Sequence, residues 1–292
     1  MSARAKIHDR VAPRQQTNWD ARAAANFICG GAGGSLMLAT GVAATMSDDD
    51  LRPLAIVALA LVGLGLNAVF FEIGRPSRAL NVFRHVSTSW MTREAWIALV
   101  LFCVGGAALL LKSAPMLLAA GGIGLGFVFA QGRMLEANKG IAAFRQKTTV
   151  ALIVSTGLAE GFGLLTVASL HWPALRVFSV ALAALLAVRF LVWRAYIGAL
   201  REGNTPAGAL KAFAAIAPLF VWAGHFAPIV LALTASLDDA GWLAAPAGAL
   251  AAVTGAALKH TLICRAAFTQ GFVLPKNPRR GGAPKLTKIQ DN

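Results

Sequence analysis

Residues 72–94 read EIGRPSRALNVFRHVSTSWMTRE, a polar and basic segment that joins two long apolar spans. The 292-residue chain is 57% apolar and its mean hydropathy is +0.63. Long apolar runs recur along its whole length, which is typical of a protein that crosses a membrane several times. The segment therefore predicts a loop at the rim of a membrane bundle, and we expect function to concentrate in this loop.

The apolar runs around this loop predict an all-α integral membrane protein. Runs of about 20 residues are long enough to cross a bilayer as helices. The fold class is therefore eight transmembrane helices in one membrane domain (21–268), between polar tails at 1–20 and 269–292. The helix count favours two four-helix bundles that divide at the fourth loop. The expected spans are 21–46, 53–73, 93–111, 114–134, 148–170, 175–198, 210–236 and 241–266.

The basic residues divide unevenly between the two sides of this bundle. Eight spans place both termini on one side, and 24 of the 27 Lys and Arg residues fall in segments assigned to that side. The other side has Arg52, Lys112 and Arg176, beside two acidic runs. Because loops rich in Lys and Arg stay in the cytoplasm, both termini and the 72–94 loop are predicted to be cytoplasmic. Membrane topology thus accounts for the net charge of +14, and no nucleic acid is expected as a partner.

The cysteines and histidines show no metal-binding pattern. Cys29, Cys103 and Cys264 occur in three different spans without a CxxC pair, so no zinc or iron–sulfur site is predicted. A membrane haem needs two histidines at matching depth on facing helices. Of the five histidines only His225 lies near the middle of a span, so no haem is expected. The first 20 residues lack the pattern of a cleaved signal peptide.

Helix-boundary chemistry marks both ends of the 72–94 segment. Gly74 with Pro76 predicts the end of the second helix. Thr92 is the expected N-cap of the third helix, which would place Glu94 in its first turn, where a carboxylate favours the helix dipole. Glu72 and Glu94 would then both lie at the cytoplasmic rim. An alternative interpretation is that the loop arginines bind lipid headgroups and that Glu94 only caps the start of the third helix.

Two asparagines inside the first two spans are candidate site residues, because polar groups are costly at membrane depth. At a rise of 1.5 Å per residue, Asn26 and Asn67 lie at similar depth, about five or six residues below the cytoplasmic rim. They would form a pocket beneath Glu72, or else bond one helix to the other.

A second polar set lies deeper in the C-terminal half and comprises Glu160, Arg189 and His225. A buried Glu160–Arg189 ion pair would reduce the cost of both charges, and a proton path is the alternative. These residues also permit a rival function, a secondary transporter with a mid-membrane site. Transporters usually show internal repeats, however, and the polar chemistry here is densest at one rim.

The 72–94 segment resembles the GRP…SW-x-x-RE signature of the membrane anchor subunits of DMSO reductase-type molybdoenzymes, within the wider polysulfide and nitrite reductase anchor family. Residues 19–27 (WDARAAANF), Phe144-Arg145 and 267–275 (AFTQGFVLP) are also similar to that family. The resemblance implies eight helices, no haem and a quinone site beside a docked iron–sulfur subunit. That partner resembles a four-cluster ferredoxin and exchanges electrons with a molybdopterin catalytic subunit. Iron–sulfur clusters and molybdopterin would therefore occur only in the partners.

The resemblance also implies roles for individual residues. Glu94 matches the acidic residue that is tied to quinone binding, and Glu72 stands where some members carry histidine, so both are candidate proton carriers. A glutamate at this position makes the chain similar to anchors of sulfite dehydrogenase and phenylacetyl-CoA oxidoreductase complexes. The expected pocket or rim for ubiquinone or menaquinone comprises Asn26, Asn67, Glu72, Arg75, His85, Arg93 and Glu94.

The resemblance and the charge distribution together predict a function. We expect an anchor in the bacterial inner membrane that is not catalytic alone and that serves anaerobic or sulfur respiration. Its partner subunits would lie on the cytoplasmic side, where quinone is reduced between the first four helices.

Overall fold

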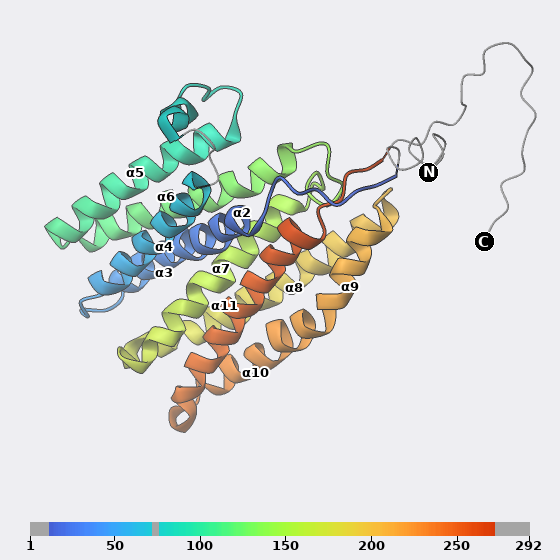
Figure 1. Cartoon of the computed structure of the whole chain (residues 1–292). Helices are drawn as coiled ribbons and strands as arrows, with labels where there is room; N and C mark the ends of the chain where they lie inside the picture. The colour runs from blue at the N-terminus through green and yellow to red at the C-terminus, as the bar shows by residue number, and fades with distance from the viewer. Residues whose placement is uncertain (1–11, 72–75, 272–292) are drawn as a thin grey trace, which may run out of the picture.

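The computed structural model describes residues 12–71 and 76–271, without the side chains of residues 76–79, Asp238 and Asp239. Within these ranges the chain folds into helices and forms two isolated β-bridges (Figure 1). Eight of the described helices are long and apolar enough to cross a membrane, which confirms the predicted fold class. They span Ala21–Ala44, Arg52–Phe70, Trp90–Leu111, Ala114–Ala137, Thr149–Leu170, Pro173–Glu202, Ala207–Thr234 and Ala240–Arg265.

Short π-helical turns interrupt two of the eight spans and end a third. The first span consists of α2 (Ala21–Ala25), the π turn η1 (Asn26–Gly30) and α3 (Gly31–Ala44). Such turns are rare and frequently occur at functional sites. The seventh span consists of α9 (Ala207–Val221), the π turn η5 (Trp222–Phe226) and α10 (Ala227–Thr234). In the eighth span, α11 (Ala244–His260) ends in the π turn η7 (Thr261–Arg265). The remaining long helices are α4 (Arg52–Phe70), α5 (Trp90–Leu111), α6 (Ala114–Ala137), α7 (Thr149–Val167) and α8 (Phe178–Glu202).

The helices form two groups of four, as the sequence predicts. In the first group, α3 packs against α4 and α6, and α6 also packs against α5 (Figure 1). In the second group, α7 packs against α8 and α11, and α10 contacts both α8 and α11. The groups meet along α3 and α7. Gly34 and Gly124 let the backbones of α3 and α6 touch, since a Cβ at either glycine would overlap the carbonyl oxygen of the other. By contrast, α4 and α5 touch each other sparsely.

Both ends of the described chain lie at the same end of the bundle. The Gln16 N–H donates to the Ala267 carbonyl at 2.9 Å, which joins the segment before α2 to the segment after η7. A β-bridge between Ile141 and Thr269 adds the fourth loop to this layer. This arrangement is the one that an even number of spans requires.

The boundaries of the second loop differ from the prediction. α4 ends at Phe70, four residues before Gly74. α5 begins at Trp90, and its N-cap is Ser89, whose side chain accepts a hydrogen bond from the Thr92 N–H at 3.3 Å. The predicted Thr92 cap is wrong because Ser89 already has the extended backbone and hydroxyl that a cap requires. Starting three residues earlier, α5 carries Glu94 past its first turn and into the bundle.

Candidate functional site

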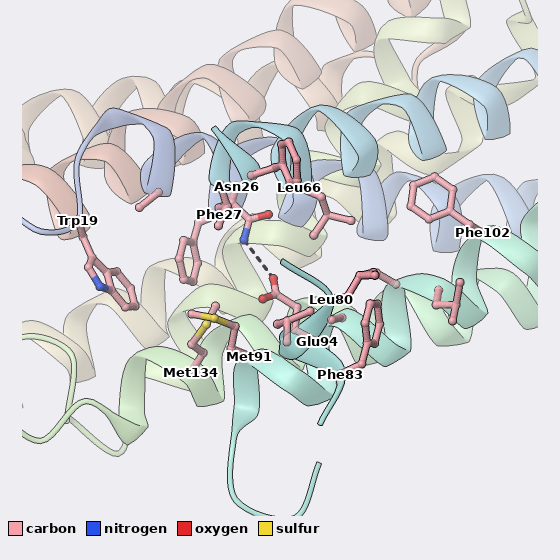
Figure 2. Close-up of a pocket in the computed structure, with 17 residues that line it drawn as sticks. Trp19, Asn26, Phe27, Leu66, Leu80, Phe83, Met91, Glu94, Phe102 and Met134 are labelled. Atoms are coloured by element: carbon pink, nitrogen blue, oxygen red, sulfur yellow. Dashed lines mark hydrogen bonds between the residues drawn. The ribbon is translucent and has the colours of Figure 1, made fainter. Parts of the chain in front are cut away.

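A cavity of about 610 Å³ lies between α4 and α5, at the end of the bundle that carries the termini. The 3-10 segment η2 (Pro76–Phe83) and the start of the first span close its other sides (Figure 2). Among the described residues its wall is almost wholly apolar, and the polar exceptions are Asn26, Glu94 and the Trp19 indole. The sparse contact between α4 and α5 leaves room for this cavity.

α5 supplies one continuous wall of the cavity. Residues 91, 94, 95, 98, 99 and 102 line it, and their spacing of three and four residues places them on one face of the helix. At the rim, Phe70, Leu80 and Leu99 are 41%, 76% and 45% exposed, whereas Glu94 is only 4% exposed. The cavity therefore opens sideways between apolar side chains and has its carboxylate at the inner end.

Asn26 links the carboxylate to the neighbouring helices. Its Nδ2 donates to Glu94 Oε1 at 3.1 Å, as Figure 2 shows, and its backbone carbonyl accepts from Gln131 Nε2 at 3.0 Å. All three side chains are buried. Asn26 Oδ1 and Gln131 Oε1 are also buried and have no hydrogen-bond partner among the described residues. Buried acceptors of this kind are normally satisfied, so the cluster has spare capacity for a donor from a bound molecule or water.

Of the two predicted asparagines, the structure brings only Asn26 to the cavity. Asn67 is exposed, and its Nδ2 donates to the Gly63 carbonyl of its own helix at 2.8 Å. Depth along the helix was predicted from residue counting, but the direction of the side chain depends on how α4 is rotated. That rotation turns Asn67 away from the site.

Of the other predicted residues, His85 and Arg93 lie in the described part of the chain and do not line the cavity. His85 is exposed in the loop before α5. Arg93 donates to the carbonyls of Val86 and Ser87 at 2.8 and 2.7 Å, so it holds the loop in shape. Glu72 and Arg75 lie outside the described residues.

Sequence reasoning overlooked Gln131 and the aromatic end of the cavity. Gln131 lies inside the fourth span, so the rule that selected Asn26 would also have selected it. Trp19 lines the cavity and stacks near Phe27 and Phe144, with ring centroids 5.9 and 5.4 Å away. The signal for Trp19 was weak because it precedes the first apolar run.

A second buried polar cluster corrects the predicted Glu160–Arg189 pair. Glu160 forms its ion pair with Lys259 of α11, with Nζ and Oε2 2.5 Å apart and both side chains at most 1% exposed. Lys259 and Arg189 were both counted among the 24 basic residues of the cytoplasmic side, yet both are fully buried in the bundle. Taking these two from the 24 basic residues leaves 22 against three, so the asymmetry of the sequence persists.

Arg189 has a different set of partners on α11 and around η5. Its Nε donates to His225 Nε2 at 3.2 Å, and its Nη1 donates to the Ala251 carbonyl at 3.1 Å. A further bond runs to the Gly224 carbonyl. His225 Nδ1 lies 2.6 Å from the Phe220 carbonyl, which makes it the donor nitrogen and Nε2 the acceptor. The cluster thus joins three spans without an acidic partner for Arg189 among the described residues.

Comparison with known proteins gives a family match. The sequence model of the family described as DMSO reductase anchor subunit (DmsC) matches residues 35–197, more than half of the chain. This range contains Glu94 and Gln131, whereas Asn26 lies just before it. No curated protein matches the chain at a significant level.

Proposed function

Because the chain belongs to the family of DMSO reductase anchor subunits, we propose that its α4–α5 cavity binds quinone and connects the quinone pool to an iron–sulfur partner. The family match and the eight apolar helices establish a multi-pass membrane anchor subunit of a molybdoenzyme complex. One observation supports the quinone site above all others: a buried carboxylate lies at the inner end of an apolar cavity that opens sideways between membrane helices.

The shape and chemistry of the cavity match an isoprenoid quinone. Such a molecule has a long apolar tail and a head with two carbonyl oxygens. Leu99 and Phe102 extend the wall down α5, where a tail would lie along the bilayer, while Glu94 and Asn26 meet the head at the inner end. Ligand sites of this kind combine apolar walls with a few placed polar groups.

Glu94 is suited to proton transfer, since it is the only ionisable group among the described residues that line the cavity. Reduction of quinone to quinol consumes two electrons and two protons. The Glu94 carboxyl would deliver one proton to a quinone oxygen and, once reprotonated by water, deliver the second, while Asn26 would hold the carboxyl in position through its 3.1 Å bond. The unpaired Asn26 Oδ1 offers an acceptor for a quinol hydroxyl.

The electrons would come from partner subunits, because the proposed role of this chain is to provide position and electrostatics. We place a four-cluster ferredoxin-like subunit over the second and fourth loops, with the molybdopterin subunit beyond it. The cavity lies beneath η2 of the second loop, which keeps the path for electrons short. The charge asymmetry supports a cytoplasmic location for these partners in a bacterial inner membrane.

The proposed orientation gives a direct prediction. A reporter that works only in the cytoplasm should be active when fused to the C-terminus, and a reporter that works only in the periplasm should be inactive there. The reason is that 22 basic residues are assigned to the side of the membrane that carries the C-terminus. Paired fusions of a cytoplasmic fluorescent protein and a periplasmic phosphatase would measure this. A fusion that is active only in the periplasm would reverse the orientation and move the partner subunits to the opposite side.

Filling the cavity tests the proposed quinone site. Ala95→Phe places a ring in the cavity one turn from Met91, so we expect the KM for quinone of the purified complex to rise about tenfold, or ~1.4 kcal/mol of binding. Electron transfer from the catalytic subunit to a soluble dye should not change. Val100→Phe is the matched control, since Val100 is exposed on the same helix and does not line the cavity. Equal quinone kinetics in both variants would place the site elsewhere.

A further inference from the structure

A second groove, of about 530 Å³, lies between α8 and α9, far from α5 across the bundle (Figure 1). Its inner wall is apolar and includes Trp193, Ile197 and Phe213. α8 and α9 make few contacts with each other, and a Cβ at Gly198 would meet nothing within 4 Å. The two facing helix surfaces thus leave an open slot that no described side chain fills.

Three cations line this groove together with its apolar wall. Arg194 and Arg201 lie on α8, about 10 Å apart along its axis at 1.5 Å per residue, and Lys211 faces them from α9. All three are exposed, and none takes part in the four ion pairs found among the described residues. No carboxylate from residues 12–71 or 76–271 lines the groove, although Glu202 follows Arg201 in the sequence. The groove therefore combines uncompensated positive charge with an apolar slot.

The surroundings of the groove face the bilayer. Leu191 on α8 and Leu219 on α9 are 66% and 53% exposed, as expected of helix surfaces that contact lipid. Arg194 lies eight residues before the end of α8, so its long side chain can reach from within the apolar layer toward the headgroup level. Basic pockets between transmembrane helices on the cytoplasmic side are a known setting for anionic lipid headgroups.

We propose that this groove is a binding site for one anionic phospholipid. The phosphate would be held by Arg194, Arg201 and Lys211, while an acyl chain fills the slot along Ile197 and Gly198. An acidic protein segment would satisfy the charges but leave the apolar wall uncovered, and a free phosphate would do the same. Such a lipid would bridge α8 and α9 outside the aromatic contacts that Trp193 makes with Phe213 and Phe220, and thereby stabilise the second four-helix group.

The test uses the purified complex in nanodiscs of phosphatidylcholine, with and without phosphatidylglycerol. Mass spectrometry of retained lipid should find phosphatidylglycerol bound at one site per anchor chain. The triple variant Arg194→Gln, Arg201→Gln, Lys211→Gln should weaken this binding by about two orders of magnitude, from ~1 kcal/mol for each cation. Lys112→Gln with Arg176→Gln, which removes exposed charges at the opposite end of the bundle, should leave it unchanged.

A second variant tests the contribution of the apolar slot separately from that of the three cations. Gly198→Leu fills the slot, keeps all three cations and introduces a better helix former, so it should fold and yet lose the lipid. Retention of lipid by both the triple variant and Gly198→Leu would overturn the proposal. Displacement of the lipid by inorganic phosphate alone would also overturn it, by showing a simple anion site. Loss of a partner subunit from the triple variant with its lipid still bound would instead identify a protein-docking surface.

Discussion

Glu94→Gln is expected to lower quinone-linked turnover of the assembled complex by about 100-fold or more, because a general acid–base group contributes roughly 10²–10⁴ to rate. The substitution keeps the shape of the side chain and an oxygen that can accept from Asn26 Nδ2, so the cavity should persist. It removes only the capacity to hold and release a proton. Steady-state assays with a quinone analogue and with a soluble dye would separate loss of quinone chemistry from loss of assembly.

Asn26 and Asn67 provide a matched pair of variants, because they lie at similar depth but only Asn26 lines the cavity. Asn26→Leu removes the bond to Glu94 and should impair quinone turnover, whereas Asn67→Leu, on the outward side of α4, should leave it unchanged. Unchanged quinone turnover in Glu94→Gln would remove this residue from the site. Loss of dye-linked activity in the same variant would show that Glu94 acts in assembly instead.

Lys259→Met should lower the free energy of unfolding by about 3–5 kcal/mol, since breaking one side of a buried ion pair leaves an uncompensated charge. The Lys259–Glu160 pair is tightly enclosed, because a Cβ at Gly31 would overlap Lys259 Nζ and one at Gly255 would overlap the Glu160 carboxylate. The Glu160 carboxylate, which is 1% exposed, would then remain buried without its cation. Unfolding titrations of the purified chain in mixed micelles would measure the loss.

A double substitution tests whether the cost arises from the unpaired charge. Glu160→Met with Lys259→Met removes both charges, so most of the lost stability should return. Val253→Met is the control for the same helix, because Val253 is 67% exposed and should tolerate the change. If Lys259→Met is as stable as Val253→Met, the pair does not stabilise the fold. If the double variant is no more stable than the single one, packing rather than charge explains the loss.

Much of the fold could be predicted because its signals are local. A run of apolar residues predicts a span without reference to any other part of the chain, and the eight predicted spans all occur. The helix ends were less accurate, as α5 shows. Ser89 and Thr92 are both suitable N-cap residues, and the choice of Ser89 depends on backbone geometry that the sequence does not specify.

Eight helices, a strongly basic set of loops and a polar rim between the second and third spans can all be predicted from the sequence, because each follows from composition over a short window. The contacts between polar groups depend on the fold. Asn26 and Glu94 are 68 residues apart in sequence, and Glu160 and Lys259 are 99 apart. Those pairings depend on the rotation of each helix about its axis and on which helices become neighbours. The same rotation that buries Asn26 beside Glu94 turns Asn67 outward, although hydropathy and depth treat the two asparagines alike.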